Sequence, residues 1–492
     1  MQAKPPRPPN ILLILGDQHR ADCVGVANRH APPDVTVQPA ALTPRLDRLG
    51  REGAVFTRAY TPAPVSAPAR QALLSGRAPE SFGALWNPNF IPTPTVKPEP
   101  GQHVAALRRA GYRSCLVGKW NSSMEHGPAD FGFDCHIDPA LHLQELARSH
   151  PDLEWTGGWL GETSPLTPEE TAVGWGARQV ERRLADFAGT QDPWFIRWDL
   201  AEPHLPCRPP ACFMELFTDR ELEPWAGFAD PLEGKPYIQS QQLLNWELEE
   251  HWNDWDWWQP VVRRYLAVIA EIDAAVGRVL DVLEEIGQAR DTLVIYSSDH
   301  GDLCGAHGML DKHYVLYDDV TRVPLLLRWP AGVRGAVVRS EPVCSMFDIG
   351  ATIIDACGLD GADPGLGESL LPLARGAEGG GRDAVVMAAH GQQFGLHTQR
   401  GLRTADWLYV WNLTDVDELY DCRRDPGQRE NRIADPACAV ILAALRKRLH
   451  KELRRRGDPF VGTPWTDRQL LDGRQVDMGL RPERSSSGLS GR

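Results

Sequence analysis

The sequence predicts an α/β fold with a largely parallel central sheet flanked by helices. Two observations lead to this prediction. Short apolar runs typical of buried strands alternate with helical patterns along most of the 492 residues, and a long amphipathic helix precedes one of these strands. A chain of this length can bury a large core, so we expect one large domain followed by a smaller α+β unit.

Apolar runs predict four strands in the first 300 residues, and glycines mark the ends of two predicted helices. The expected strands cover residues 11–15, 113–117, 194–200 and 292–296. A helix over 103–110 ends at Gly111. A long amphipathic helix begins at Pro260 and continues through Ile286, and Gly287 marks its end.

The remaining elements suggest where the chain divides. A strand is expected over 323–329, and Asp348 is expected to cap a helix that continues to Cys357. The glycine-rich segment 376–382 is the best domain boundary, which gives a catalytic domain over 9–375 and a C-terminal subdomain over 383–460. In that subdomain we expect strands over 401–412 and 418–421 and a helix over 438–455. The tail 482–492 is expected to be disordered.

Composition excludes several classes of protein. A net charge of −14 and a pI near 5.6 argue against a partner that is a nucleic acid or an anionic membrane. No run of about 18 apolar residues appears, so no membrane span is expected. The polar, proline-rich start lacks a signal-peptide pattern, which favours a cytoplasmic location. The ten cysteines are dispersed and are expected to be reduced thiols.

The segment that begins at Ser66 carries the strongest local signal. It reads Ser-Ala-Pro-Ala-Arg and continues Gln-Ala-Leu-Leu-Ser-Gly-Arg. A hydroxyl side chain lies at the start of an expected helix, and Pro68 suits the first turn. The helix N-terminus and Arg70 make the surroundings of Ser66 electropositive, which suits an anionic group. The alternative is an ordinary N-capping serine.

Two expected strands end in a carboxylate followed by another polar side chain. Asp17 and Gln18 follow the first strand, and Asp299 and His300 follow the strand over 292–296. Ligands gather at the carboxyl ends of strands in open α/β sheets. Together these side chains suit one divalent cation, with Ca²⁺ as first choice and Mg²⁺ or Mn²⁺ as alternatives. Turn residues and helix caps are the alternative for either pair alone.

The order of these motifs along the chain resembles the type I sulfatases of the alkaline phosphatase superfamily, over about residues 9–455. The further matching segments are Gly-Tyr-Arg-Ser-Cys-Leu-Val-Gly-Lys-Trp, Pro-His-Leu-Pro, Gly-Met-Leu-Asp-Lys and Glu-Leu-Tyr-Asp. The resemblance implies an alkaline phosphatase-like mixed sheet and a small C-terminal antiparallel sheet. It also implies that Asp17, Gln18, Asp299 and His300 hold one metal ion, in the pattern of choline sulfatases and phosphonate monoester hydrolases.

The resemblance further implies a catalytic set. Ser66 would be oxidised to formylglycine, in this family by a radical S-adenosylmethionine maturase, and its hydrate would attack sulfur. Arg70, Lys119, His204 and Lys312 would hold the sulfuryl oxygens, and His204 or Lys312 would protonate the leaving oxygen. Many sulfatases carry histidine where this chain has Asn121, which cannot act as a base. His126 or His307 is then a candidate for that task.

The expected function is a sulfuric ester hydrolase that releases inorganic sulfate from a carbohydrate or aryl sulfate. The alternatives are a phosphodiesterase or phosphonate monoester hydrolase, with unmodified Ser66 as nucleophile, and an inactive anion-binding homologue. The segments 141–171 and 213–258 are the expected pocket walls. Asn87 and Asn89 are weaker candidates for the pocket. Stacking on a sugar or an aromatic ring is one possible role for Trp155, Trp159, Trp225 and the tryptophans of 252–258. The alternative is that these tryptophans pack a core or a subunit contact, which leaves the oligomeric state open.

Overall fold

The computed structural model describes residues 8–391 and 395–473, and its centre is an eight-stranded sheet. The strand order is β5-β4-β6-β1-β7-β8-β2-β9. The strands in that order are Cys135–Ile137, Arg113–Gly118, Trp194–Pro203, Asn10–Asp17, Thr292–Ser298, Leu325–Arg328, Ala54–Phe56 and Val337–Arg339. The expected α/β class with a mixed, largely parallel sheet is confirmed.

The middle of the sheet is parallel and fully buried. β1 pairs with β6 on one side, where Ile11 lies beside Phe195, and with β7 on the other, where Ile11 lies beside Leu293. All eight residues of β1 are buried because helices cover both faces of the sheet. β8 runs antiparallel to its neighbours β7 and β2, which makes the sheet mixed. As a result, the carboxyl ends of β1, β6 and β7 meet at one edge.

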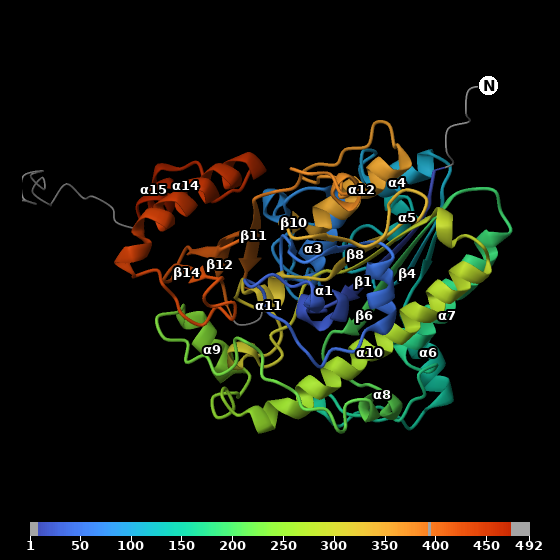
Figure 1. Cartoon of the computed structure of the whole chain (residues 1–492), viewed down its shortest axis with the longest axis horizontal. Coiled ribbons are helices and arrows are strands. Elements are labelled where there is room, and N and C mark those ends of the chain that lie inside the picture. Colours follow the sequence, from blue (N-terminus) through green and yellow to red (C-terminus); the bar gives the residue numbers. More distant parts are fainter. Residues whose placement is uncertain (1–7, 392–394, 474–492) are drawn as a thin grey trace, which may run out of the picture.

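Helices form a layer on each face of this sheet (Figure 1). One layer contains α7 (Ala172–Ala188) and α10 (Trp255–Glu285), which pack on each other and on β6. The other contains α3 (Ser66–Ser75), α4 (His103–Arg109) and α12 (Ser345–Cys357), which contact one another.

Two predicted helix starts are wrong. α10 begins at Trp255 rather than Pro260, because Asp254 accepts a hydrogen bond from the Trp257 amide and caps the helix there. Pro260 lies inside the helix. α12 begins at Ser345, and the Asp348 carboxylate accepts from the Cys344 amide from within the first turn.

A second, smaller sheet lies toward the C-terminus. Its antiparallel strands in order are β11 (Ala384–His390), β12 (Thr398–Thr404), β13 (Trp407–Asn412) and β14 (Glu418–Asp421). The single strand predicted over 401–412 is therefore two strands joined by a turn. α14 (Ala439–Arg456) packs on this sheet through Leu442, Leu445 and Leu449 (Figure 1). The exact division of the chain at 375 and 383 stays a prediction, and the tail 482–492 lies outside the described residues.

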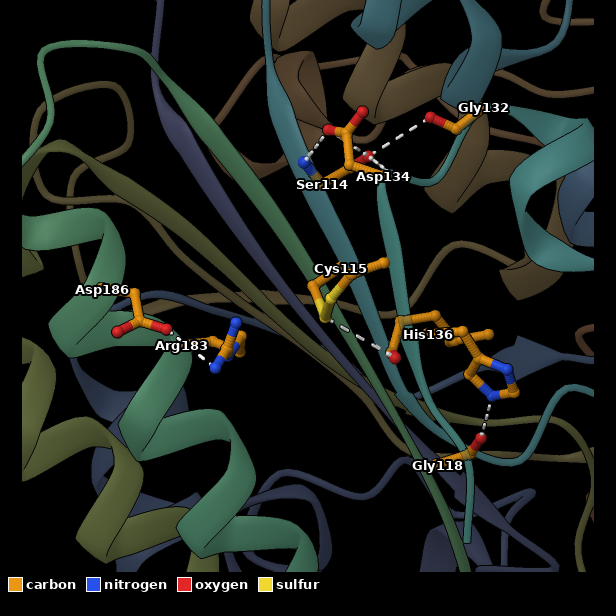
Figure 2. Close-up of a disulfide and its surroundings, with 10 residues drawn as sticks. Ser114, Cys115, Gly118, Gly132, Asp134, His136, Arg183 and Asp186 are labelled. Atoms are coloured by element: carbon orange, nitrogen blue, oxygen red, sulfur yellow. Dashed lines mark hydrogen bonds and ion pairs between the residues drawn. A yellow bond between two sulfur atoms is a disulfide. The ribbon is translucent and has the colours of Figure 1, made fainter. Parts of the chain in front are cut away.

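One pair of cysteines departs from the prediction of reduced thiols. Cys115 of β4 and Cys135 of β5 form a disulfide between neighbouring strands (Figure 2). The parallel register places the two residues side by side, with their Cα atoms 4.7 Å apart, a distance that suits a disulfide. The spacing of 20 residues gave no sign of this contact, because the pairing of β4 with β5 creates it. The other eight cysteines are free.

Within residues 8–391 and 395–473, every helix is too short or too polar to cross a lipid bilayer.

Candidate active site

Acidic side chains from separate strands converge at one edge of the sheet. Asp17 ends β1, and Asp299 and His300 directly follow β7. One ligand atom from each of these three residues lies within 4.8 Å of the others, and all three residues are fully buried. The parallel pairing of β1 with β7 places these residues at the same edge. The structure thus brings together the two pairs that the sequence singled out.

Gln18 lies beside this cluster and links it to other groups. Its backbone amide donates to Asp299 at 3.2 Å, and its Nε2 donates to Asp302 at 2.7 Å. Its Oε1 accepts a hydrogen bond from Lys312 at 3.0 Å. The side chain therefore has its amide oxygen turned toward Lys312 and its amide nitrogen turned toward Asp302.

The three clustered residues fit a divalent cation. His300 Nδ1 donates to the Gly301 carbonyl at 2.9 Å, so Nε2 carries the lone pair and faces Asp17 and Asp299. Burial lowers the pKa of His300, which favours the neutral imidazole that metals require. Two carboxylates and an imidazole are donors that Ca²⁺, Mg²⁺ or Mn²⁺ accept.

Ser66 is directed at the same cluster. It is the first residue of α3, and its Oγ donates to Asp17 at 3.3 Å and lies 3.0 Å from His300 Nε2. Val65 is the N-cap residue of this helix, and the Ser66 hydroxyl turns to Asp17 and His300 rather than to the helix backbone. Instead, the Ala67 amide donates to the Asn87 side chain at 2.9 Å. The alternative of an ordinary N-capping serine is therefore not what the geometry shows.

Arg70 lies one turn further along α3 and is completely buried among carboxylates. Its Nε donates to Asp299 at 3.0 Å, its Nη2 to Asp17 at 3.2 Å, and its Nη1 to Asp199. We expected Arg70 to contact an anionic substrate, and the structure places it behind the acidic cluster instead. Burial opposes the positive charge of Arg70, but the three neighbouring carboxylates raise its pKa. Burial opposes the charge of Asp17, but Lys119 and Arg70 hold its pKa well below the usual range.

Lys119 follows β4 and extends to Asp17, with which its Nζ forms an ion pair. The backbone that leads into it is fixed: the Lys119 amide donates to the Asp199 carbonyl at 2.9 Å, and Gly118 has a φ of +99°. A Cβ at Gly118 would lie 2.0 Å from the Asp199 carbonyl oxygen. Only glycine therefore allows β4 to deliver Lys119 to this place.

His204 and Lys312 form a hydrogen-bonded pair. His204 Nδ1 donates to the Leu205 carbonyl at 2.6 Å, so Nε2 is the acceptor for Lys312 Nζ at 2.7 Å. Burial, together with the positive charge of Lys312, lowers the pKa of His204 to about 4. Burial opposes the charge of Lys312, but Asp311, 3.0 Å away, and Asp17 raise its pKa. The pair thus carries one positive charge, which lies on Lys312, while His204 is neutral.

A cavity of about 440 Å³ opens above Ser66. Its walls include the expected groups Lys119, His204, Asn87 and Asn89, together with Asn121. Its other lining residues are Pro88, Phe90, Trp120, Ser122, Ser123 and Met124.

Neither alternative to the missing histidine lines this cavity. His126 contacts Trp120 through its backbone carbonyl and lies 3.9 Å from Asp130. His307 hydrogen-bonds Asp230 at 2.6 Å and stacks on Tyr317. The proposal that one of them replaces the usual histidine therefore has no support from the geometry.

The two expected pocket walls fare differently. Residues of 141–171 line a second cavity that also touches His204. No residue of 213–258 lines either of these two cavities. Trp225 lies under the Arg20 guanidinium, and Trp258 is fully buried and donates to the His251 carbonyl. The alternative of core packing is the correct one for these two tryptophans.

Sequence reasoning missed three acidic residues of the site. Asp199 binds Arg70 and also accepts two hydrogen bonds from Arg197, at 2.8 and 2.6 Å. Asp302 binds Gln18, and Asp311 pairs with Lys312. Asp199 could have been found, because it lies near the end of a predicted strand at the same edge as Asp17. Asp302 and Asp311 lie in loops, where no periodicity indicates their direction.

Comparison with known proteins agrees with this geometry. The profile of the family described as Sulfatase matches residues 9–359 of the chain. A second profile, N-sulphoglucosamine sulphohydrolase, C-terminal, matches residues 305–455. An uncharacterized sulfatase of Escherichia coli K12, YidJ, is 29% identical over 505 aligned residues that cover 98% of this chain and 95% of that protein.

Solved structures share the fold. A phosphonate monoester hydrolase of Agrobacterium radiobacter superposes with a TM-score of 0.73 at 22% identity, covering 91% of this chain and 96% of that one. A structure described as a complex with its substrate D-glucosamine-2-N,6-O-disulfate superposes with a TM-score of 0.72 at 19% identity, covering 92% and 99%. At these identities the superpositions show the architecture alone.

Proposed function

The chain belongs to the sulfatase family and is a hydrolase of sulfate esters, and from this premise we propose that Ser66 is the residue at which the ester is attacked. The observation that carries the proposal is the direction of its hydroxyl. It faces Asp17 and His300 rather than capping its own helix, and it borders a cavity that Lys119 and His204 also line. A nucleophile and groups that stabilise an oxyanion are thus next to each other.

We propose further that Ser66 is oxidised to formylglycine by a radical S-adenosylmethionine maturase. The modification supplies an aldehyde hydrate, which can release the sulfate that it accepts, whereas a sulfate ester of plain serine is hard to hydrolyse. The family membership supports this step, and the exposure of Ser66 to the cavity supplies the access that the substrate needs.

Asp17, Gln18, Asp299 and His300 are the proposed ligands of one divalent metal ion, with Ca²⁺ as first choice. The ion would supply Lewis-acid stabilisation of the nucleophile and the sulfuryl oxygens. Arg70 is then a positioning residue, because its guanidinium holds Asp17 and Asp299 in place from the buried side. Asp199 holds Arg70 in turn.

Lys119, His204 and Lys312 are the proposed binding groups for the sulfuryl oxygens. His204 lines the cavity and accepts a hydrogen bond from Lys312, the charged member of the pair, so a proton of Lys312 can pass to the leaving oxygen. Asn121 also lines the cavity and can donate a hydrogen bond, but it cannot remove a proton. Among the imidazoles of the described chain, His204 is the one that lines the cavity, so we propose that it replaces the histidine common in the family.

The proposed substrate is a saccharide sulfate ester. The structural neighbour described with D-glucosamine-2-N,6-O-disulfate supports this class. A second candidate is phosphonate monoester hydrolysis, which the Agrobacterium neighbour favours. We regard it as the weaker candidate, because the family profile over residues 9–359 is that of the sulfatases.

The test begins with the modification. Trypsin releases residues 59–70 as one peptide, and mass spectrometry of protein co-expressed with a serine-type maturase should show a species that has lost two hydrogens at Ser66. The modified protein should release inorganic sulfate from sugar or aryl sulfates faster than it cleaves an aryl phosphonate monoester. Unmodified Ser66 in active protein would contradict the formylglycine proposal, and a preference for the phosphonate would favour the second candidate.

The cytoplasmic location remains our prediction. The disulfide between Cys115 and Cys135 bears on it, because such bonds are rare in reducing compartments. Fractionation of the producing cells, with alkylation of free thiols in each fraction, tests both points. Recovery of the protein outside the cytoplasm would contradict the prediction.

A further inference from the structure

A second cavity, of about 190 Å³, lies beside the one above Ser66. We call it the side chamber. His204 lines both cavities, so this residue lies where the two adjoin. A cavity of about 150 Å³ accepts a benzene ring, so the side chamber has room for a six-membered ring. Any group attached to a sulfate ester near His204 therefore has a space of suitable size next to it.

One wall of the side chamber is apolar. It includes Trp155, Leu146, Leu166 and Val268, which come from three separate parts of the chain. The Trp155 ring is held in place by the Arg208 guanidinium, whose carbon lies 4.5 Å from the ring centre. Flat and aliphatic surfaces of this kind suit the C–H face of a ring.

The lining also includes two carboxyl groups, those of Glu271 and Glu202. Glu271 is 3% exposed and accepts a hydrogen bond from Thr171 Oγ1 at 2.5 Å. That threonine also caps α7, since its Oγ1 accepts from the Gly174 amide at 3.1 Å. The Glu271 carboxyl is therefore fixed by a rigid helix end rather than by a mobile loop.

We propose that the side chamber binds the uncharged, hydroxylated ring of the alcohol from which sulfate is removed, with Glu271 as the residue that recognises its hydroxyl groups. This inference rests on the proposed function, because it takes the sulfate to bind between Ser66 and His204. It goes further by assigning the substrate class to named residues: Trp155 and Leu146 pack on the ring, and Glu271 hydrogen-bonds to it.

The chemistry of the side chamber favours a sugar over the other alcohols. An aryl group would leave Glu271 with Thr171 as its hydrogen-bond partner and would make no hydrogen bond to the rest of the carboxyl group, at a cost of about 1–3 kcal/mol. A cationic alcohol would meet the charge of Arg208, which also lines the chamber. Burial, with a smaller contribution from Glu202, raises the pKa of Glu271 to about 8, so near neutral pH the carboxyl both donates and accepts hydrogen bonds. Sugar hydroxyls match that pattern.

The test separates ring binding from sulfate binding. In a Ser66→Ala background, which cannot turn substrate over, calorimetry measures the affinity for inorganic sulfate, 4-nitrophenyl sulfate, choline sulfate and glucose and galactose monosulfates esterified at each hydroxyl. Leu146→Trp fills the chamber from a partly buried position on α6 (Ala140–Ser149). Leu141→Trp on the same helix is the matched control, because Leu141 is 47% exposed and lies outside the chamber lining. Glu271→Gln keeps the shape and the bond from Thr171.

We expect at least one sugar sulfate to bind more tightly than inorganic sulfate. Leu146→Trp should lower the affinity for that sugar sulfate at least tenfold more than the affinity for inorganic sulfate. Glu271→Gln should lower the affinity for the sugar sulfate about threefold to tenfold more than the affinity for inorganic sulfate. The Leu141→Trp control should bind like its parent. Equal effects of Leu146→Trp on sugar and inorganic sulfate, or a chamber-dependent preference for choline sulfate or the aryl sulfate, would overturn the inference. Failure of the proposed function looks different: the Ser66 parent would then release sulfate from none of these esters.

Discussion

Replacing Lys312 by methionine gives the sharpest test of the catalytic assignment. The change keeps the length of the side chain and removes a buried ammonium that donates to His204 at 2.7 Å and to Gln18 at 3.0 Å. A lost hydrogen bond from a charged group costs about 1.5–3 kcal/mol, so anion binding alone should reduce kcat/KM by about 10- to 100-fold for every sulfate ester. Loss of the proton for the leaving oxygen should reduce the rate by a further factor of about 100 or more.

The rate loss that comes from the missing proton depends on the leaving group, so it can be measured by comparing two substrates. An alkyl alcohol, such as a sugar hydroxyl, leaves poorly without a proton, whereas 4-nitrophenolate leaves readily. We therefore expect Lys312→Met to reduce kcat/KM about 10³- to 10⁴-fold on a sugar sulfate and about 10- to 100-fold on 4-nitrophenyl sulfate, a difference of about 2.7 kcal/mol in activation free energy. Steady-state kinetics of both substrates, by sulfate release, give the two values.

Folding and metal content must be controlled separately. Removing Lys312 leaves Asp311 without one of its two partners, and breaking a buried pair costs about 3–5 kcal/mol, less here because His313 stays 3.0 Å from Asp311. Urea unfolding and elemental analysis of bound metal should show a folded, metal-bearing variant. Lys447→Met, at an exposed position on α14, is the matched control. Near-normal rates would remove Lys312 from the site, and equal losses on both substrates would refute its role in protonation.

Three further predictions concern the metal cluster, a buried carboxyl and a glycine. Asp299→Asn should reduce metal affinity by at least 100-fold, because mutation of a group that only supports a metal ligand already lowers the affinity about 10- to 100-fold. The exposed Asp291→Asn variant is the control, and equal metal content in the two variants after dialysis would contradict the assignment. The pKa of Glu271 is raised to about 8, so native protein binds a proton that unfolded protein has lost between about pH 4.5 and 8, and stability falls as pH rises through that window. From pH 5 to 8, the parent should lose on the order of 3 kcal/mol more unfolding free energy than Glu271→Gln, and parallel urea titrations would argue against the shift. Gly118→Ala should destabilise the protein by at least about 3 kcal/mol and reduce activity, because the new Cβ would clash with the Asp199 carbonyl. Gly111→Ala is the control, because Gly111 has a similar φ of +85° but open space around it, and it should destabilise the protein by about 1 kcal/mol. Equal losses of unfolding free energy in the two variants would refute the argument.

Much of the scaffold was predictable because its signals are local. Apolar runs bounded by turn residues marked β1, β4, β6 and β7, and the glycine-rich segment 376–382 preceded the small antiparallel sheet. The two helix starts were missed because a capping contact decides each of them. Asp254 caps α10 ahead of a proline that seemed to be the natural start, and Asp348 caps α12 from inside it.

The sequence by itself determined which chemical groups this protein has and in what order: the Ser66 segment, the carboxylates at two strand ends and the basic residues at their motif positions. Tertiary structure alone decided what each group faces. Arg70 turns to three carboxylates, Lys312 to His204, and Cys115 to Cys135, while the tryptophans at 225 and 258 pack in the core. The physical reason is that strand order and register bring these residues together from positions as much as 294 residues apart, and no local periodicity encodes that distance.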